Sequence, residues 1–250
     1  MCNLYSMTTT KEAMRKLFRV DGGWNQLHLP GVFPDKPAPI VRRRPPGERE
    51  IIAARWGMPT PPAFRKGPID RGVTNIRNTN SPHWRAWMKP ENRCLVPVTS
   101  FCEPTDAADP VTGRKVWTWF AFNDERPLFA FAGIWRTWHG TRGTQKAPEQ
   151  GEHLLFGFLT TAANGVIAPV HAKAMPVILQ TAEECDAWLT VNPTEALKMQ
   201  RPLPDDVLKI VATGEKEDPP PAPAHREEMP AVAPELPLRL ADLRSTRNDS

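Results

Sequence analysis

The sequence is poor in cysteine and tyrosine and contains no long apolar run. Its 250 residues include four cysteines and one tyrosine. The cysteines show neither the C-x-x-C spacing of a zinc site nor the framework of a secreted disulfide-bonded domain, so a reducing, cytoplasmic setting fits best. No stretch approaches the roughly 18 apolar residues of a membrane-spanning helix, and the first residues lack the apolar segment of a secretory signal. We therefore expect no membrane association and no bound metal.

Charge is unevenly distributed along the chain. Residues 1–100 carry 17 Lys and Arg against 7 Asp and Glu, whereas residues 101–250 carry 15 against 21. Arginine and lysine neutralise phosphates and release their counterions, so a basic first section is typical of a polyanion-binding surface. A basic face that is merely solvated would explain the same composition.

The hydrophobic pattern predicts a fold dominated by strands. Segments rich in Val, Phe, Trp and Leu predict strands at 51–56, 94–98, 116–122, 128–135 and 154–161, and the turn residues 123–127 indicate a hairpin. Capping boxes at Thr9–Glu12 and Thr181–Glu184 predict helices, the first over 9–19 and ended by Gly22-Gly23, and apolar spacing predicts a short third helix over 81–89. Proline-rich segments at 30–48 and 58–70 read as loops. We expect an α+β fold around a curved antiparallel sheet.

The end of the chain differs in composition from the rest. From residue 214 onward, proline and charged residues dominate, and such a segment buries too little apolar surface to offset its ordering entropy. We expect one domain over residues 2–213 and a disordered tail over 214–250. No repeat or coiled-coil pattern is visible, so we expect a monomer.

The second residue of the chain is a cysteine, which suggests a reactive amino terminus. The sequence begins Met1-Cys2-Asn3, and cysteine is small enough for methionine aminopeptidase to remove Met1. The mature chain would then offer an α-amine and a thiol in one residue. This pair condenses with an aldehyde, first to a Schiff base and then to a thiazolidine ring, and the amine, with a pKa of about 7.7–8.0, is partly free base at neutral pH. A cysteine present by chance is the alternative.

Three further positions carry residue types suited to catalysis. Asn75 lies in a polar loop and can orient a substrate as donor and acceptor. Glu103 follows an apolar strand, where hydrophobic neighbours raise a carboxyl pKa and allow proton transfer. His171 follows a loop of small residues and can exchange protons near neutral pH. Each also fits a purely structural role.

Basic and aromatic residues near the start of the chain suggest a single-stranded nucleic acid as partner. Trp56 ends a strand among basic residues, and a base can stack on such a ring while cations hold the phosphates. Arg77 can grip a phosphate through two hydrogen bonds. The remaining candidates for phosphate contact are Arg42, Arg43, Arg44, Arg55, Arg65, Lys66 and Arg85. Structural roles for Trp56 and Arg77 remain alternatives.

The ordered set of motifs resembles one family. The set comprises Cys2, Trp56-Gly-Met58, Asn75-x-Arg77, Arg93-Cys-Leu-Val-Pro97, Phe101-Cys-Glu103, Phe131-Ala-Gly-Ile-Trp135, Thr160-Thr-Ala-Ala-Asn164 and His171 before Met175-Pro-Val-Ile-Leu179. It resembles the SRAP family, the SOS-response-associated peptidases or abasic-site processing proteins, over roughly residues 2–210. The chain departs from the family pattern at residues 3–4, around Glu103, and at 172–174, where the histidine loop is one residue longer.

The resemblance implies a function and a site. Family members bind single-stranded DNA that contains an abasic site and form a thiazolidine cross-link between the N-terminal cysteine and the sugar aldehyde. By position, Cys2 matches the nucleophile, Asn75, Glu103 and His171 match the other active-site residues, and Arg77 matches a DNA-contacting residue. The family fold is a mixed structure around a barrel-like antiparallel sheet. In a bacterium, such a protein would be cytoplasmic and associated with the nucleoid.

The resulting hypothesis is capture of abasic sites without any cofactor. His171 would protonate the sugar ring oxygen as general acid while the amine of Cys2 attacks C1′, Asn75 would position the reactants, and Glu103 would move protons. One rival is a cysteine autopeptidase that uses Cys2 with His171 as base. The other is a DNA-binding module in which Cys2 is incidental.

Overall fold

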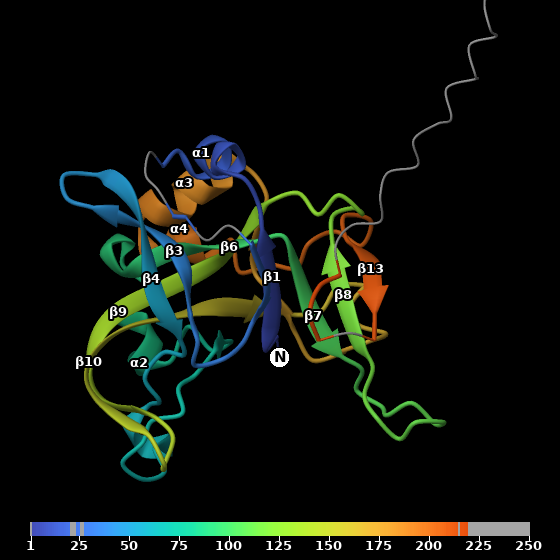
Figure 1. Cartoon of the computed structure of the whole chain (residues 1–250). Coiled ribbons are helices and arrows are strands. Elements are labelled where there is room, and N and C mark those ends of the chain that lie inside the picture. Colours follow the sequence, from blue (N-terminus) through green and yellow to red (C-terminus); the bar gives the residue numbers. More distant parts are fainter. Residues whose placement is uncertain (1, 21–23, 26–27, 215, 220–250) are drawn as a thin grey trace, which may run out of the picture. The chain divides into compact units, whose positions relative to one another are not determined.

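The computed structural model describes residues 2–20, 24–25, 28–214 and 216–219, and these form two β-sheets with a few short helices (Figure 1). The strands are β1 Leu4–Thr8, β2 His28–Val32, β3 Pro37–Arg44, β4 Glu48–Trp56, β5 Asn75–Ile76, β6 Arg93–Val98, β7 Ser100–Pro104, β8 Trp117–Ala121, β9 Phe129–Gly143, β10 Pro148–Thr161, β11 Met175–Pro176, β12 Ile178–Leu179 and β13 Lys209–Thr213. The helices are α1 Lys11–Phe18, α2 Pro82–Arg85, α3 Ala182–Thr190 and α4 Pro193–Leu197, with 3-10 turns at Pro62–Phe64 and Pro90–Asn92. The predicted stop at Gly22-Gly23 and most of the predicted tail lie outside the described residues.

Five strands close a barrel. β3 pairs with β4 and β6, β6 pairs with β9, β9 pairs with β10, and β10 returns to β4. The closing pair is parallel, with Phe156 opposite Trp56, while the other four pairs are antiparallel. The predicted curved, barrel-like sheet is therefore confirmed, with one parallel seam that the sequence pattern did not indicate.

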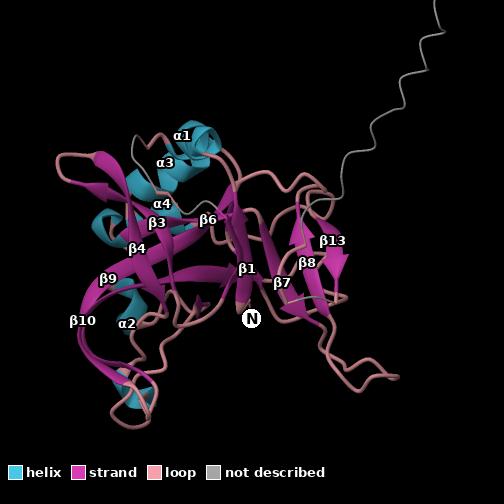
Figure 2. Ribbon diagram, viewed as in Figure 1, coloured by secondary structure: helices cyan, strands magenta, loops and turns pink. Residues whose placement is uncertain are grey.

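Side chains alternate between the two faces of the barrel wall, as the two-residue period of a strand requires. In β6, Cys94, Val96 and Val98 face the interior, whereas Leu95 faces outward. The outward apolar residues of the wall are covered by α1 and α3, which supply buried residues such as Phe18 and Trp188 (Figure 2). Where both faces of the wall are covered, as in β6, the strand reads as a nearly continuous apolar run in the sequence.

The second sheet has the strand order β13-β8-β7-β1-β2. Its inner face carries Tyr5, Phe101 and Phe120, which pack into the barrel interior. The ring of Tyr5 meets those of Trp56 and Phe131 with centroids 5.2 and 5.9 Å apart. This packing anchors β1, and with it the start of the chain, between the two sheets.

Two predictions about the strands are wrong. The expected hairpin between 116–122 and 128–135 does not form, because β8 lies in the second sheet and β9 lies in the barrel. Residues 30–48 are not a loop but contain the end of β2, all of β3 and the first residue of β4. The prolines of β3, Pro37 and Pro39, are tolerated because the pairing of β3 with β6 involves other residues of β3, so the missing N–H groups need no partner on that side.

The helix predictions are confirmed in part. α3 begins after Thr181, whose hydroxyl accepts a hydrogen bond from the Glu184 amide at 3.2 Å, as the capping box predicts. α1 begins one residue later than the predicted box, because Thr10 rather than Thr9 caps it through the Ala13 amide at 3.1 Å. The helix expected over 81–89 is only α2, followed by turns.

Candidate active site around Cys2

Cys2 lies just before β1, buried at the junction of the two sheets. Its side chain belongs to the shared core of the barrel and the inner face of the second sheet, and its Sγ donates a weak hydrogen bond to the Leu4 carbonyl at 3.4 Å. In the antiparallel pairing of β1 with β7, Leu4 lies opposite Cys102, so the chain before Leu4 runs beside Glu103. Burial raises the pKa of the Cys2 thiol, and the charge of Glu103 raises it further. The thiol is therefore protonated at neutral pH.

Asn75 fixes the backbone of Cys2. β5 runs parallel to β10, with Asn75 opposite Phe158, and this pairing brings the amide to the sheet junction. Its Nδ2 donates to the Cys2 carbonyl at 2.7 Å and to the Thr74 hydroxyl at 2.8 Å. Its Oδ1 is buried and accepts no hydrogen bond from the residues that the structure describes. One amide oxygen is thus available as an acceptor next to the first residues of the chain.

Glu103 is a fully buried carboxyl near the end of β7. Its side chain shares the inner face of the sheet with Phe101, two residues earlier. Burial raises the pKa of Glu103 to about 8, although the positive charge of the amino terminus acts in the opposite direction. At neutral pH, Glu103 is therefore predominantly a carboxylic acid that can donate a proton.

The loop after β10 places His171 near Cys2 and Glu103. Asn164 shapes this loop, because its side-chain oxygen accepts from the Ile167 amide at 3.2 Å, and the His171 amide then donates to the Ile167 carbonyl at 2.8 Å. The imidazole is 7% exposed in the folded chain. Its Nδ1 donates to Oδ1 of Asp106 at 2.8 Å.

Asp106 is a site residue that the sequence analysis missed. Its second oxygen accepts from the Ala172 amide at 3.0 Å, and its own amide donates to the Val170 carbonyl at 2.9 Å, so the carboxylate is held against the histidine loop. Because 65 residues separate Asp106 from His171, no local pattern reveals the pair. The pairing leaves Nε2 of a neutral His171 as a proton acceptor.

The electrostatics of these groups are coupled. Burial and then the charge of the amino terminus lower the pKa of His171, while Asp106 opposes the change. After the dominant effect of burial, Asp106 also contributes to the raised pKa of Glu103. The environment therefore reverses the usual order of the two pKa values, because it raises that of Glu103 above that of His171. At neutral pH, Glu103 holds a proton and His171 does not. Such inversion is typical of a pair of groups that exchange protons during a reaction.

The predicted phosphate contacts fall into two groups. Arg77 and Lys66 are exposed, and Arg85 is exposed on α2, where it donates to the Asn80 carbonyl. Arg77 follows Asn75 by two residues, which puts it next to the site. Arg43, on β3, is half-buried.

The other four predicted arginines form ion pairs with carboxylates. Arg42 pairs with Glu50, Arg44 with Glu48, Arg55 with Asp35 and Glu149, and Arg65 with Asp70. Arg42 also lies over the ring of Trp135, 4.1 Å from its centroid. A phosphate would have to compete with these carboxylates, so this part of the basic segment is less cationic than its composition suggests.

Trp56 is a packing residue in this structure. It has no exposed surface, its ring stacks on Phe158 with centroids 5.2 Å apart, and its Nε1 donates to the Thr74 carbonyl at 3.2 Å. A base cannot stack on a ring that is covered on all sides. The expected role of Trp56 in DNA contact is therefore replaced by a structural one, which supports the segment that carries Asn75.

Neither a metal centre nor a membrane span is found within the part of the chain that the structure describes. No three His, Cys, Asp or Glu side chains are grouped there as metal ligands. None of the helices there is both long enough and apolar enough to cross a bilayer.

Fold and site together define a β-barrel protein with a cysteine near its amino terminus, held beside an asparagine, a buried glutamate and an aspartate-paired histidine. A sequence profile described as "SOS response associated peptidase (SRAP)" matches residues 1–216. The chain belongs to this family. Curated proteins give no match to the sequence.

Solved structures with the same fold exist. A crystal structure of a Bordetella bronchiseptica protein is 24% identical, with a TM-score of 0.63, over 85% of this chain and 98% of that one. A Bacteroides thetaiotaomicron protein is 23% identical, with a TM-score of 0.61, over 84% and 90% of the two chains. A phage-related protein from Bordetella bronchiseptica is 16% identical, with a TM-score of 0.60, over 84% and 92%. At these identities the likeness concerns the fold.

Proposed function

We propose that this protein captures abasic sites in single-stranded DNA by forming a thiazolidine between Cys2 and the aldehyde of the open sugar. The proposal requires removal of Met1, which turns the Cys2 amide nitrogen into an α-amine. The observation that carries it is the convergence of Asn75, Glu103 and His171 on the first residues of the chain. Asn75 binds the Cys2 carbonyl directly, and the charge of Glu103 acts on the pKa of the Cys2 thiol. Asp106, which binds His171, in turn acts on the pKa of Glu103.

The chemistry begins at the amine. The α-ammonium group has an ordinary pKa of about 7.7–8.0, and neutral His171 can take its proton through Nε2. His171 then gives this proton to the sugar ring oxygen as the bond from C1′ to that oxygen breaks, and the C1′ hydroxyl releases its proton to water to leave the aldehyde. In this scheme His171 acts first as base and then as acid, because burial keeps it neutral at the start. Asn75 orients the amine through its available Oδ1.

Glu103 serves the later steps. Attack of the amine on C1′ gives a carbinolamine, and the protonated Glu103 donates to its hydroxyl, which leaves as water. The resulting Schiff base is attacked by Sγ of Cys2, and the Glu103 carboxylate takes the thiol proton. C1′ thereby exchanges two bonds to oxygen for one bond to nitrogen and one to sulfur, and one water is released. Because Glu103 begins and ends this cycle protonated, its raised pKa matches its task.

A denaturing gel with a labelled single-stranded oligonucleotide tests the proposal. The native protein should give a heat-stable shifted band with abasic DNA, but not with the same oligonucleotide after borohydride reduction of its aldehyde. Cys2→Ala should give no such band. A variant with one alanine inserted before Cys2 should also fail, because its amine and thiol no longer share a residue. A stable band from either variant would refute the thiazolidine assignment.

The family description favours a second candidate, a peptidase. A cysteine peptidase needs a thiolate that a neighbouring histidine generates. Here burial and then the charge of Glu103 raise the pKa of the Cys2 thiol, so a thiolate is disfavoured at neutral pH. Intact mass separates the candidates, since capture requires loss of Met1 alone and self-cleavage would remove more.

A further inference from the structure

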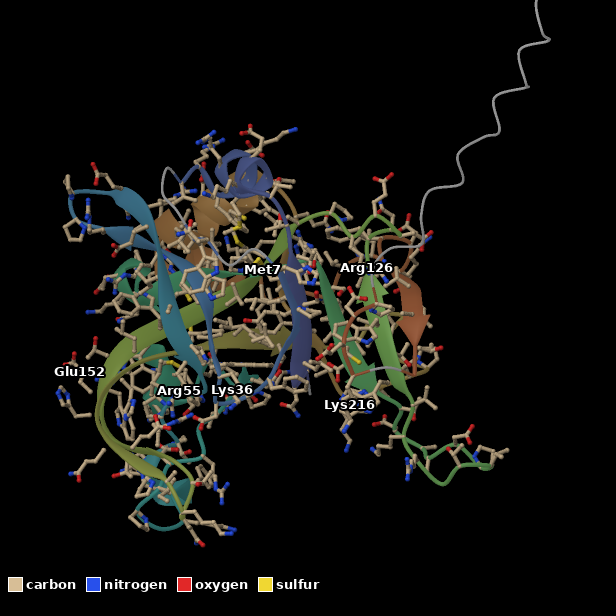
Figure 3. The ribbon with its side chains drawn as sticks, viewed as in Figure 1. Met7, Lys36, Arg55, Arg126, Glu152 and Lys216 are labelled. Carbon is tan, nitrogen blue, oxygen red and sulfur yellow. The ribbon has the colours of Figure 1, made fainter. Side chains whose placement is uncertain are left out.

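An open groove of about 1040 Å³ lies at one end of the second sheet. It is lined by Thr112, Arg114–Trp117, Gly214 and Lys216, and we call it the β8-entry groove. Its residues come from the hairpin loop between β7 and β8 and from the chain that leaves β13. Lys216 and Arg126 lie near opposite ends of β8 (Figure 3).

The strand pairing brings this groove close to the active site. β1 pairs with β7, β7 pairs with β8, and Trp117 at the start of β8 lies opposite Pro104, the residue after Glu103. Neighbouring strands are about 4.8 Å apart, so the groove begins about 10 Å from the strand that follows Cys2. That separation is well inside the span of a bound single strand, whose sites cover roughly 4–16 nucleotides.

The groove opens on the outer face of the sheet. Trp117 shares its face with Cys102 and Trp119, whereas Glu103 faces inward. A DNA strand that leaves the reaction centre would therefore round the end of β7 before entering the groove.

The groove is cationic and its cations are available. Within the described part of the chain, none of Arg114, Lys115 and Lys216 forms an ion pair with a carboxylate, in contrast to Arg42, Arg44, Arg55 and Arg65 on the other sheet.

Two acidic residues lie close in the chain to the groove residues. Asp109 accepts hydrogen bonds from the amides of Val111 and Thr112 inside the hairpin loop, which fixes the loop conformation. Glu217 is exposed, and its Cγ lies 3.6 Å from the Cβ position of Gly31 on β2. Among the residues that the structure describes, the lining carries three cationic side chains and no carboxylate, and Asp109 accepts a hydrogen bond from the hydroxyl of the lining residue Thr112.

The groove also contains an aromatic platform. Trp117 is half-buried, and Nζ of Lys216 lies over its ring, 5.7 Å from the centroid. A base that stacks on this face takes the place of the lysine, whose charge then stays beside the ring. A tryptophan face beside cations is the arrangement that binds single-stranded nucleic acid, because the ring stacks on a base of any sequence while the cations hold phosphates. The shape, the charge and the position of the groove all fit a single-stranded nucleic acid.

We propose that the β8-entry groove binds the DNA strand on one side of the abasic nucleotide, with phosphates on Arg114, Lys115 and Lys216 and a base on Trp117. The inference rests on the proposed function, since the occupant is the strand whose abasic sugar reacts with Cys2. Arg77, next to Asn75, would hold the strand on the other side.

The test is Arg114→Gln combined with Lys115→Gln, both in the exposed loop. The matched control is Lys11→Gln with Lys16→Gln, which removes the same charge from exposed positions on α1, beyond the opposite end of β1. Fluorescence anisotropy would measure the affinity for an abasic oligonucleotide, with thermal midpoints to verify folding. The loss of two single-strand phosphate contacts predicts about 25-fold weaker binding at 0.1 M salt and a salt slope shallower by about 1.4.

Oligonucleotide length provides the second readout. The loss of affinity caused by the groove substitutions should shrink to that of the control variant when the nucleotides on one particular side of the abasic site are removed. If native protein forms the cross-link but the groove variant binds every oligonucleotide as the control does, the groove proposal is refuted and abasic-site capture stands. If the native protein forms no cross-link at all, the proposed function itself fails.

Discussion

Replacing Glu103 with glutamine should abolish a loss of stability that the native protein suffers as pH rises. The Glu103 carboxyl has no exposed surface, and burial raises its pKa from 4.5 to about 8. Between these pH values, the folded protein holds a proton that the unfolded chain has released, so the free energy of unfolding falls as pH increases. The total loss above pH 8 is about 5 kcal/mol, of which about 2 kcal/mol falls between pH 6 and pH 8.

Urea unfolding at several pH values between 6 and 9 measures this effect. For a denaturant slope of about 2 kcal/mol/M, the midpoint of the native protein should fall by about 1 M between pH 6 and pH 8 relative to Glu103→Gln. Glutamine keeps the shape of the side chain but cannot ionise. Other titrating groups, such as His171 and Asp218, are present in both proteins and cancel in the difference.

Glu125→Gln is the control, because this residue is exposed in the loop after β8 and loses the same charge. Its profile should run parallel to that of the native protein. Parallel profiles for Glu103→Gln as well would refute the reasoning, since the carboxyl would then titrate alike in the folded and unfolded chains. A difference of opposite sign would mean that Glu103 is ionised and paired in the folded protein.

Further predictions concern the site and one helix. Cys2→Ala should lose the heat-stable cross-link but keep a Schiff base that borohydride traps on a gel. Asp106→Asn should lower the pKa of His171 further, because Asp106 raises it, and should move the acid limb of the cross-linking rate profile to lower pH; an unmoved limb would mean that Asp106 is only structural. Arg77→Ala should weaken DNA binding and reduce its salt slope by about 0.7, as anisotropy would measure. Thr181→Ala should destabilise the protein by about 1 kcal/mol in urea unfolding through loss of the α3 cap, with an unchanged midpoint as the contrary outcome.

Local signals in the sequence predicted individual helices and strands well, but they did not predict which strands pair with each other. The capping box at Thr181 predicts α3 correctly, because a cap depends on residues three apart. The pairing of β8 depends instead on strands that are distant in the sequence, and the five residues from Asn123 to Pro127 fit a crossing between sheets as well as a hairpin. Arg126 in this connection pairs with buried Asp218, a contact that no local pattern reveals.

The long β9–β10 hairpin extends beyond its predicted ends for a related reason. Its outer half is polar and aromatic, so the apolar pattern stops near Trp135. The structure continues the strands through side-chain pairs across the hairpin, such as Trp138 stacked on His153 with ring centroids 6.1 Å apart. Charge and aromatic residues stabilise these strand ends, and an apolar pattern does not register them.

In the candidate site, too, the sequence predicted the residues but not the effects of contacts between distant parts of the chain. Family resemblance gave Cys2, Asn75, Glu103 and His171 as residues, and the structure gathers their elements at one junction. It could not give their protonation states, because these depend on burial and on Asp106, which is remote in sequence. The expectation that His171 starts as an acid changes for this reason.

The position of Cys2 also bears on which atom reacts first. Chain termini usually fray, but here β1 is an inner strand of its sheet, and Tyr5 anchors it in the barrel core. This anchoring holds the future α-amine in place, yet it also buries the thiol and raises its pKa. A thiol without thiolate character is a poor first nucleophile, whereas an amine with a pKa of about 7.7–8.0 is partly free base. The fold therefore favours an order in which the amine attacks first and the thiol closes the ring afterwards.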